Sequence, residues 1–315
     1  MTALFSFGLG IGTQNNNSEW LEVFYPQPQL NPGNAVKSVL EGEKTLSSIA
    51  DQFKHSEKPA VASILESDDN PSTVPEGYLK LHLLSHRLVK PNNINLNGLF
   101  GVLPNVAWTS EGAIDINELA ERQLRARLNK LTLSVDSIDK FPKMVDYVVP
   151  AGVRIADTAR VRLGAYIGEG TTIMHEGFVN FNAGTESTSM IEGRISQGVF
   201  VKSGSDLGGG SSTMGTLSGG GNIIITVGNQ CLLGANAGLG IPLGDRCTVE
   251  AGLYITAGTK VTLLDDHGET VGQTKARELA GKDDLLFRRN STTGTVECLT
   301  NKSAVELNEA LHASN

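Results

Sequence analysis

One short stretch of the chain places a carboxylate and a guanidinium two residues apart, at Glu192 and Arg194. A positioned carboxylate can act as a general base or a nucleophile, and an arginine can hold a carboxylate through two parallel hydrogen bonds. Residues 206–222, DLGGGSSTMGTLSGGGN, follow closely and contain seven glycines, which expose backbone N–H groups and let a ligand approach. These two segments are the candidate functional part of the sequence, although each residue taken singly could be an ordinary loop residue.

Both segments interrupt a repeat in which a large aliphatic residue returns every six positions. Small or turn-forming residues separate the aliphatic positions, so each hexamer is typical of one short strand and one tight corner. The repeat extends over residues 151–263, where 23 of the 36 glycines lie. Its positions are Ile155, Val161, Ile167, Ile173 and Val179, then Ile195, Val201 and Leu207, then Val227, Leu233 and Leu239, and finally Leu243, Val249, Ile255 and Val261.

Three hexamers make one triangular coil, and a single coil cannot bury its aliphatic face alone. Stacked coils bury a continuous column and pair their backbones at a spacing of about 4.8 Å. The pattern is typical of the left-handed parallel β-helix. We therefore predict a mainly β protein: an α+β N-terminal domain, a left-handed parallel β-helix and a short C-terminal capping segment.

The domain boundaries follow from where the repeat begins and ends. We expect an N-terminal mixed α/β domain at 1–108, a linker helix and connection at 109–150, the β-helix at 151–263 and a C-terminal segment at 264–315. Within these, the alternating leucines of Tyr78–Val89 predict a half-buried strand.

A helix is expected after Asp115, because Asp115 and Glu118 resemble a capping box. The apolar face of this helix is expected to pack between the first domain and the β-helix, or against a neighbouring subunit. That face consists of Ile116, Ala120, Leu124 and Leu128. In the last segment we expect a short helix at TKARELAG, a hairpin at STTGTVECL and a helix near the C-terminus.

Composition excludes several classes of protein. The formal net charge is −8 and no long basic run is present, so nucleic-acid binding is unsupported. No apolar stretch approaches the length of a membrane span, and the N-terminus does not resemble a secretory signal, so a cytoplasmic location is expected. The three cysteines, Cys231, Cys247 and Cys298, are expected to be reduced and structural.

His175 is the only histidine in the repeat, which bears on competing functions. A metal-dependent carbonic anhydrase of this architecture needs three histidines, so that function is nearly excluded. A histidine base would suit an O-acyltransferase, which stays open. A pure scaffold is disfavoured because the repeat is interrupted and a cation-rich segment follows the last coil. A nucleotidyltransferase fusion is disfavoured because the N-terminal half has no glycine-rich nucleotide loop.

Long literal strings resemble the tetrahydrodipicolinate N-succinyltransferase family, in the branch found in actinobacteria and some pseudomonads. The resemblance extends from about Tyr78 to Arg289 and is weak over residues 1–75. The strings that carry it are LLSHRLV, GVLPNVAW, HEGFVNFNAGT, EGRIS, GGGSSTMGTLSGGG, LLGANAGLGI, VEAGLYITAGT, KARELAG and LLFRRNS.

The resemblance implies an acyl transfer in lysine and diaminopimelate biosynthesis. The succinyl group of succinyl-CoA, the co-substrate, would move to the amine of opened tetrahydrodipicolinate, giving N-succinyl-2-amino-6-oxopimelate and CoA. The motif MIEGRIS implies that Glu192 is the catalytic carboxylate, through an acyl-anhydride or as a general base, and that Arg194 orients a substrate carboxylate. A CoA-dependent acetyltransferase acting on another amine or hydroxyl remains the alternative.

The resemblance also implies binding residues for the CoA arm and its phosphates. They are Gly209, Ser212, Ala235, Glu250, Ala251, Gly258, Lys275, Arg288, Arg289, Asn290 and Ser291. It implies a homotrimer that acts on small molecules, with active sites between neighbouring subunits. Glu176 matches a position that can bind magnesium on the trimer axis, but the family's partner acid falls on Ala159, with Asp157 two residues away. Such a metal would be structural.

Overall fold

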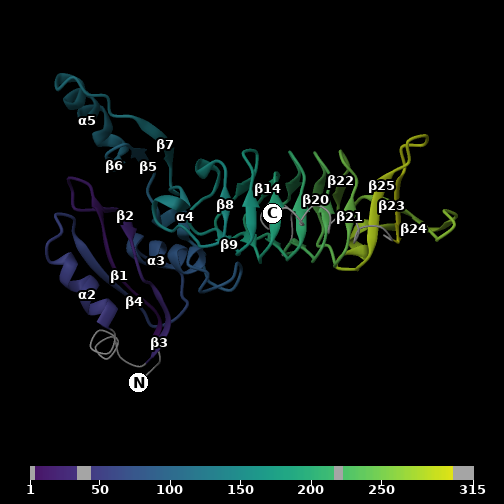
Figure 1. The fold of residues 1–315 in the computed structure, drawn as a ribbon, viewed down its shortest axis with the longest axis horizontal. Helices are drawn as coiled ribbons and strands as arrows, with labels where there is room; N and C mark the ends of the chain where they lie inside the picture. The colour runs from purple at the N-terminus through teal and green to yellow at the C-terminus, as the bar shows by residue number, and fades with distance from the viewer. Residues whose placement is uncertain (1–3, 34–43, 216–222, 301–315) are drawn as a thin grey trace. The chain divides into compact units, whose positions relative to one another are not determined.

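The computed structural model of the 315-residue chain describes residues 4–33, 44–215 and 223–300. The chain divides into two compact units, Met1–Val149 and Pro150–Asn315. The N-terminal unit mixes sheets and helices, whereas the other is built from short strands stacked in a row (Figure 1). Each unit is described by itself below.

The N-terminal unit begins with an antiparallel sheet organised around one long strand. β1 pairs with β2, β3 and β4, and the register over Ser6–Ile11 is regular against β4. The elements are β1 (Leu4–Gln14), β2 (Trp20–Phe24), β3 (Gln29–Gly33), α2 (Lys44–Phe53) and β4 (Ala60–Leu65). This sheet and α2 are the first part of the N-terminal unit.

The strand expected at Tyr78–Val89 is wrong, because most of this segment belongs to helix α3 (Val74–Ser85). Thr73 caps the helix by accepting a hydrogen bond from the Glu76 N–H, and α3 packs against β2 and β4. Ten of its residues are buried, so nearly all its sides face protein and its leucines need no helical spacing. His82 lies fully buried there, and burial lowers the pKa of its imidazole to about 3.

The rest of this unit is a three-stranded antiparallel sheet of order β6-β5-β7 with one long helix. The helix begins as expected: Asp115 accepts a hydrogen bond from the Asn117 N–H. Glu118 does not close a capping box, since its carboxylate accepts from the Asn16 N–H instead. The elements are α4 (Leu99–Val102), β5 (Val106–Thr109), β6 (Gly112–Asp115), α5 (Ile116–Leu128), β7 (Val135–Asp139) and η1 (Met144–Asp146).

The expected apolar face of α5 does not enter the core of the described chain. Ile116, Leu124 and Leu128 are 38%, 59% and 75% exposed. The helix packs through Leu119 and the buried Ala126 instead, against Ala107 and Ile114. Packing of the helix between the first domain and the β-helix, or against a neighbouring subunit, stays a prediction.

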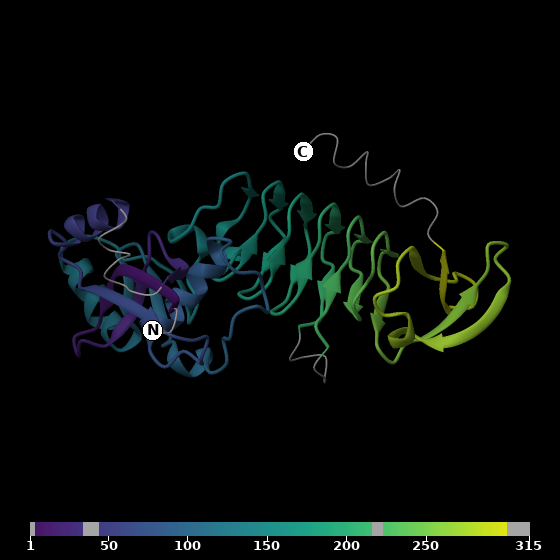
Figure 2. The same ribbon diagram turned by 90° about the horizontal axis from the view of Figure 1, so that it is seen from below.

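The C-terminal unit is a parallel β-helix with three faces (Figures 1 and 2). The first face contains β8 (Arg154–Ile155), β10 (Thr171–Ile173), β13 (Ser189–Ile191), β16 (Ser205–Leu207), β19 (Leu232–Leu233) and β21 (Thr248–Val249). The second contains β11 (Phe178–Val179), β14 (Arg194–Ile195), β17 (Ser212–Thr213), β20 (Gly238–Gly240) and β22 (Tyr254–Thr256). The third contains β9 (Tyr166–Ile167), β12 (Gly184–Thr185), β15 (Phe200–Val201) and β18 (Thr226–Val227), and the turn η2 (Thr158–Arg160) lies in the first coil.

The aliphatic repeat is the core of this β-helix. From Val161 to Val261 every aliphatic repeat position is at most 3% exposed, and strands of successive coils pair in parallel through these residues, as at Ile173 and Ile191. Corners that carry positive φ angles, such as Gly170 and Gly204, turn the chain between faces. The repeat expected from the sequence is confirmed.

The C-terminal segment closes the stack. β25 pairs in parallel with β21 and antiparallel with β26, so it covers the edge that the last coil would expose. The elements are β23 (Lys260–Leu264), β24 (Thr270–Lys275), η3 (Ala276–Leu279), β25 (Leu285–Arg289) and β26 (Val296–Thr300). The expected hairpin and the expected short helix, here a 3-10 turn, are confirmed. A second hairpin is formed by β23 and β24. The helix expected at 303–315 lies outside the described residues.

Candidate active site

The repeat loses two residues at one corner, and that corner carries Glu192. The aliphatic positions Ile191 and Ile195 are four residues apart, whereas the same step in the neighbouring coils takes six, from Ile173 to Val179 and from Leu207 to Thr213. Only Glu192 and Gly193 therefore connect β13 to β14. The break in phase seen in the sequence is a shortened corner, not an inserted loop.

Backbone hydrogen bonds fix this shortened corner to the next coil. The Glu192 N–H donates to the Leu207 carbonyl at 2.8 Å, and the Glu192 carbonyl accepts from the Gly210 N–H at 3.3 Å. The Arg194 N–H donates to the Ser211 carbonyl at 2.8 Å. Because both flanks of Glu192 are held, its side chain leaves the coil from a rigid position.

Two glycines allow the close approach of these coils. A Cβ atom at Gly193 would lie 2.0 Å from the Ser211 Oγ, so no larger residue fits without movement. A Cβ atom at Gly209 would lie 3.4 Å from the Glu192 Oε2, which places the carboxylate beside the glycine-rich corner of the next coil. The structure thus brings together the two segments that the sequence singled out; residues 216–222 lie outside its description.

Small residues continue from Gly209 along successive corners of the same edge. The Asn236 N–H donates to the Gly209 carbonyl at 2.9 Å, and the Gly252 N–H donates to the Ala235 carbonyl at 2.8 Å. Ala235 and Ala251 are exposed at these corners, two residues after the aliphatic positions Leu233 and Val249. The expected lining residues Gly209, Ala235 and Ala251 therefore form one column.

A second column, on the adjoining face, contains Arg194 and Ser212. The pairing runs from Phe178 to Arg194, from Arg194 to Ser212, and on to Gly238 and Tyr254. Arg194 is exposed, so its guanidinium is accessible two residues from Glu192. The sequence interpretation missed Tyr254, whose ring occupies the space beside Gly238 that a Cβ atom would need. The glycine at 238 could have indicated this contact, because the preceding positions of the column carry side chains.

Ser211 is a further residue that the sequence interpretation passed over. Its hydroxyl is buried beneath the Glu192 corner and has no hydrogen-bond partner among the described residues. Buried polar atoms without a hydrogen-bond partner are uncommon. The close packing of this corner therefore leaves one polar group unsatisfied.

The expected phosphate-binding residues at the end of β25 have different contacts. Arg289 lies next to the corner column, because its backbone N–H donates to the Glu250 carboxylate at 2.6 Å. Arg288 instead pairs with Glu297 at 3.0 Å, and the Asn290 side-chain amide donates to the same carboxylate at 2.8 Å. Glu297 thus already compensates the charge of Arg288, while Ser291 is exposed on the following turn.

Gly258 and Lys275 form another small group at a different corner. The Ala276 N–H donates to the Thr259 carbonyl at 2.9 Å, which brings the end of β24 against the corner after β22. Both residues are exposed, and a Cβ atom at Gly258 would meet nothing within 4 Å. This corner therefore has open space beside Gly258 and the exposed ammonium group of Lys275.

His175 and Glu176 are exposed on the corner one coil before Glu192. The Glu176 carbonyl accepts from Arg160 at 2.9 Å, which orders the corner without using the carboxylate. Across the described ranges, no group of three or more histidine, cysteine, aspartate or glutamate side chains could hold a metal ion.

A parallel β-helix whose corners carry a carboxylate, an arginine and a column of glycine and alanine residues is typical of hexapeptide-repeat acyltransferases. Family models agree with this class: one described as tetrahydrodipicolinate N-succinyltransferase middle matches residues 103–143, and one described as hexapeptide repeat of succinyl-transferase matches residues 224–257. No helix in the described part of the chain is long and apolar enough to cross a membrane.

Full-length relatives identify the family. The chain is 64% identical to a protein of Pseudomonas paraeruginosa and 57% identical to one of Vibrio cholerae, covering 99% of this chain in both and 99% and 100% of the relatives. Both are named 2,3,4,5-tetrahydropyridine-2,6-dicarboxylate N-succinyltransferase. A crystal structure from Campylobacter jejuni, described as a 2,3,4,5-tetrahydropyridine-2-carboxylate N-succinyltransferase, is 32% identical, with a TM-score of 0.85 over 97% of this chain and 94% of that one.

The chain therefore belongs to the tetrahydrodipicolinate N-succinyltransferase family. The resemblance noted in the sequence is confirmed. So is the expected fold class, a left-handed parallel β-helix with a mixed N-terminal part and a C-terminal cap.

Proposed function

We propose that this chain carries out the reaction named for its relatives, with Glu192 as the catalytic carboxylate. Succinyl-CoA donates the succinyl group, and the amine of opened tetrahydrodipicolinate accepts it, giving N-succinyl-2-amino-6-oxopimelate and free CoA. The observation that carries the assignment to Glu192 is the two-residue corner, whose backbone is held by hydrogen bonds to the next coil and which places the carboxylate beside Gly209.

Two routes are compatible with this geometry. As a general base, Glu192 accepts a proton from the acceptor amine while the nitrogen attacks the thioester carbon and CoA leaves as a thiolate. As a nucleophile, a Glu192 oxygen attacks the thioester carbon, CoA leaves, and the amine then attacks the mixed anhydride and regenerates the carboxylate. In both routes the departing thiolate ends as the thiol.

Arg194 has a separate role in this proposal. Its exposed guanidinium, two residues from Glu192, is suited to hold a carboxylate of the donor or the acceptor through paired hydrogen bonds. Both substrates carry carboxylates, and a carboxylate contact fixes the reacting groups in orientation. At the glycine-rich corner the N–H groups of Gly208, Gly210 and Ser211 already donate to carbonyls, so the Gly209 N–H is the candidate donor to the oxyanion that forms at the thioester carbon.

The donor and the acceptor can be tested together by following thiol release. We expect succinyl-CoA to release CoA at a high rate only when tetrahydrodipicolinate is present, and acetyl-CoA to react much more slowly. Equal rates with acetyl-CoA would favour the alternative, an acetyltransferase of the same architecture. Release that does not depend on the acceptor would remove the assignment altogether.

The CoA arm is proposed to lie along the small-residue corners, with its phosphates near cations of the C-terminal segment. Gly209, Ser212, Ala235, Glu250, Ala251 and Gly258 would line the arm, and Lys275, Arg288, Arg289, Asn290 and Ser291 would serve the phosphate end. The column from Gly209 to Ala251 and the contact of Arg289 with Glu250 support this direction.

Among these cations, Lys275 and Arg289 are expected to matter more than Arg288. Lys275→Met or Arg289→Met should raise the KM for succinyl-CoA by about tenfold, because a charge-assisted hydrogen bond to phosphate is worth roughly 1.5–3 kcal/mol. Arg288→Met should have a smaller effect on KM, since Glu297 already pairs with Arg288. Steady-state kinetics measure these changes, and Lys130→Met in the N-terminal unit is the control. A donor KM unchanged in both variants would contradict the phosphate assignment.

We propose that the active enzyme is a homotrimer whose sites lie between neighbouring β-helices. The exposed corners that carry Arg194, Ala235 and Ala251 support it, because a groove for an extended CoA arm needs a second wall. Activity should therefore disappear when sedimentation shows dissociation to monomers on dilution. Full activity in the monomer range would contradict the shared site.

A structural magnesium ion and a cytoplasmic location complete the proposal. Glu176 offers one exposed carboxylate per chain, so an axial ion would need the same residue from three copies, without help from Ala159. The ion supplies no step of the acyl transfer. Oxygen ligands of this type are those that Mg²⁺ accepts.

A further inference from the structure

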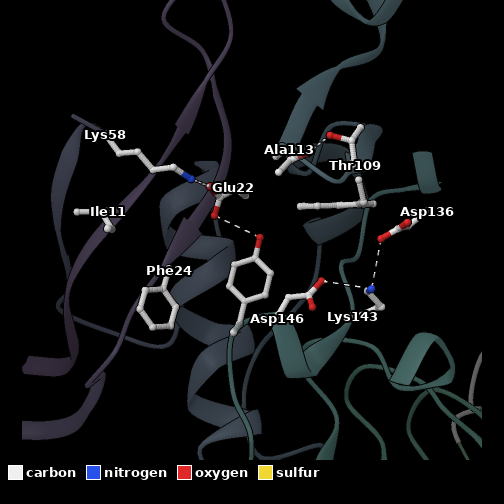
Figure 3. Close-up of a pocket in the computed structure, with 12 residues that line it drawn as sticks. Ile11, Glu22, Phe24, Lys58, Thr109, Ala113, Asp136, Lys143 and Asp146 are labelled. Atoms are coloured by element: carbon white, nitrogen blue, oxygen red, sulfur yellow. Dashed lines mark hydrogen bonds and ion pairs between the residues drawn. The ribbon is translucent and has the colours of Figure 1, made fainter. Parts of the chain in front are cut away.

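The N-terminal unit contains a cavity that the succinyl transfer does not use (Figure 3). Its volume is about 490 Å³, and small-molecule sites typically occupy roughly 300–1,000 Å³. Strands β1 and β2 line one side, and β5, β6, β7 and η1 line the other. All of the lining belongs to this unit, so the cavity is separate from the β-helix residues that carry the proposed chemistry.

A buried carboxylate faces this cavity. Glu22 is only 5% exposed and accepts hydrogen bonds from the Thr13 hydroxyl at 2.6 Å and the Tyr147 hydroxyl at 3.2 Å. Lys58 approaches the carboxylate only to 3.7 Å and donates its hydrogen bond to Thr13 instead. Burial raises the pKa of the Tyr147 phenol well above its usual value, so this hydroxyl stays a neutral donor.

Burial of the Glu22 carboxylate in this way lowers the stability of the folded protein. A buried carboxylate costs several kcal/mol unless it is fully compensated, and its partners here are two neutral hydroxyls and one distant ammonium group. A glutamine would keep hydrogen bonds at the same place without the charge. A cation bound in the cavity would therefore stabilise the Glu22 carboxylate.

A second set of charges lies across the cavity from Glu22 (Figure 3). Lys143 approaches Asp136 at 3.5 Å and Asp146 at 3.8 Å, and both carboxylates are about half exposed. The lining thus holds three carboxylates, at Glu22, Asp136 and Asp146, against two ammonium groups, at Lys58 and Lys143, which leaves a net charge of −1. Both signs are present on both sides.

Apolar side chains complete the lining. Ile11 and Phe24 belong to the Glu22 side, and Trp108 belongs to the other. Trp108 is 7% exposed, and its indole N–H is already satisfied by the Asp139 carbonyl, so the ring offers its face as apolar surface. A face of this kind also attracts cations.

We propose that this cavity is a binding site for a dibasic amino acid. Such a molecule carries two ammonium groups and one carboxylate, and its net charge of +1 matches the charge of the lining. The side-chain ammonium pairs with Glu22, the α-ammonium and α-carboxylate pair with the Lys143, Asp136 and Asp146 group, and the aliphatic stem lies against Ile11, Phe24 and Trp108. The site is thus a second small-molecule site, distinct from the acyl-transfer site.

Calorimetric titration of the full-length protein at low ionic strength tests the proposal. L-lysine is the probe, and three relatives remove one feature each: L-norleucine lacks the side-chain ammonium, cadaverine lacks the carboxylate, and L-glutamate reverses the side-chain charge. We expect L-lysine to bind at least tenfold more tightly than each of them. No saturable binding of L-lysine at millimolar concentration, or equal binding of L-norleucine, would overturn the proposal.

Two variants locate the bound molecule. Glu22→Gln and Asp146→Asn should each weaken L-lysine binding by about tenfold, and Glu121→Gln, an exposed position on α5, should leave it unchanged. Asp146 is half exposed, so its variant folds even where Glu22→Gln does not. Glu192→Gln must bind L-lysine like the parent. Binding that survives in both cavity variants but is lost in Glu192→Gln would place the ligand in the acyl-transfer site and overturn the proposal.

Discussion

Replacing Glu192 by glutamine is expected to lower the rate of acceptor-dependent thiol release by about 10²–10⁴-fold, the usual contribution of a positioned acid–base group. Glutamine has the same shape but neither accepts a proton from the amine nor attacks a thioester. Because backbone hydrogen bonds hold the corner on both sides of residue 192, the substitution should leave the fold intact. The KM for succinyl-CoA should change little, since the carboxylate is not proposed to bind the donor.

The same assay distinguishes the two routes. A burst of one thiol per active site in the absence of acceptor would indicate the anhydride, whereas a general base gives no burst. Glu169→Gln, at an exposed corner of the same β-helix, is the matched control and should behave like the parent. Equal rates for Glu192→Gln and the parent would remove Glu192 from the mechanism.

Replacing Gly193 by alanine is expected to damage both stability and activity. The added Cβ atom would lie 2.0 Å from the Ser211 Oγ and 2.7 Å from the Ser211 carbonyl oxygen, so the coils must separate locally. Overpacking of this kind costs typically 1–3 kcal/mol of unfolding free energy. The same movement displaces Glu192, so we expect kcat/KM to fall at least tenfold, because small misplacements of a catalytic group are costly.

A second substitution separates steric clash from other causes. Ser211→Ala alone should be nearly neutral, because its hydroxyl has no hydrogen-bond partner among the described residues. In the Gly193→Ala background it removes the shorter contact and should restore part of the stability and activity. Gly272→Ala is the control, since a Cβ atom there meets nothing within 4 Å. Urea unfolding and steady-state kinetics measure both effects, and a Gly193→Ala enzyme with parental values would contradict the importance of the corner.

The β-helix could be predicted from the sequence because each hexamer contains its own buried aliphatic residue and its own corner residues. Val201, Val227 and Leu239 are apolar for the same local reason, and the structure buries all three completely. The N-terminal unit gave weaker signals. α3 was interpreted as a strand because Leu79, Leu81 and Leu83 alternate, and alternation cannot identify a strand when an element is buried on nearly every side.

For helix α5, the sequence predicted the element but not the side that is buried. Its spacing and its cap predicted the helix correctly, but the predicted face contains Leu124 and Leu128, which are exposed in the described chain. Periodicity indicates which residues share a side; it does not indicate what lies opposite that side. The burial of Ala126 depends on the position of β5 and β6, which the local sequence of the helix does not contain.

The candidate site divides in the same way. By itself, the sequence determined the six-residue repeat and the family, and it predicted Glu192 and Arg194 as site residues, because these are properties of consecutive residues. Only the tertiary structure decided three further features. The break at Glu192 is a two-residue corner beside Gly209, Glu297 forms an ion pair with Arg288, and a charged cavity lies next to Glu22. The physical reason is that these contacts join residues 9 to 125 positions apart, where partner and distance are set by how elements pack and not by neighbours along the chain.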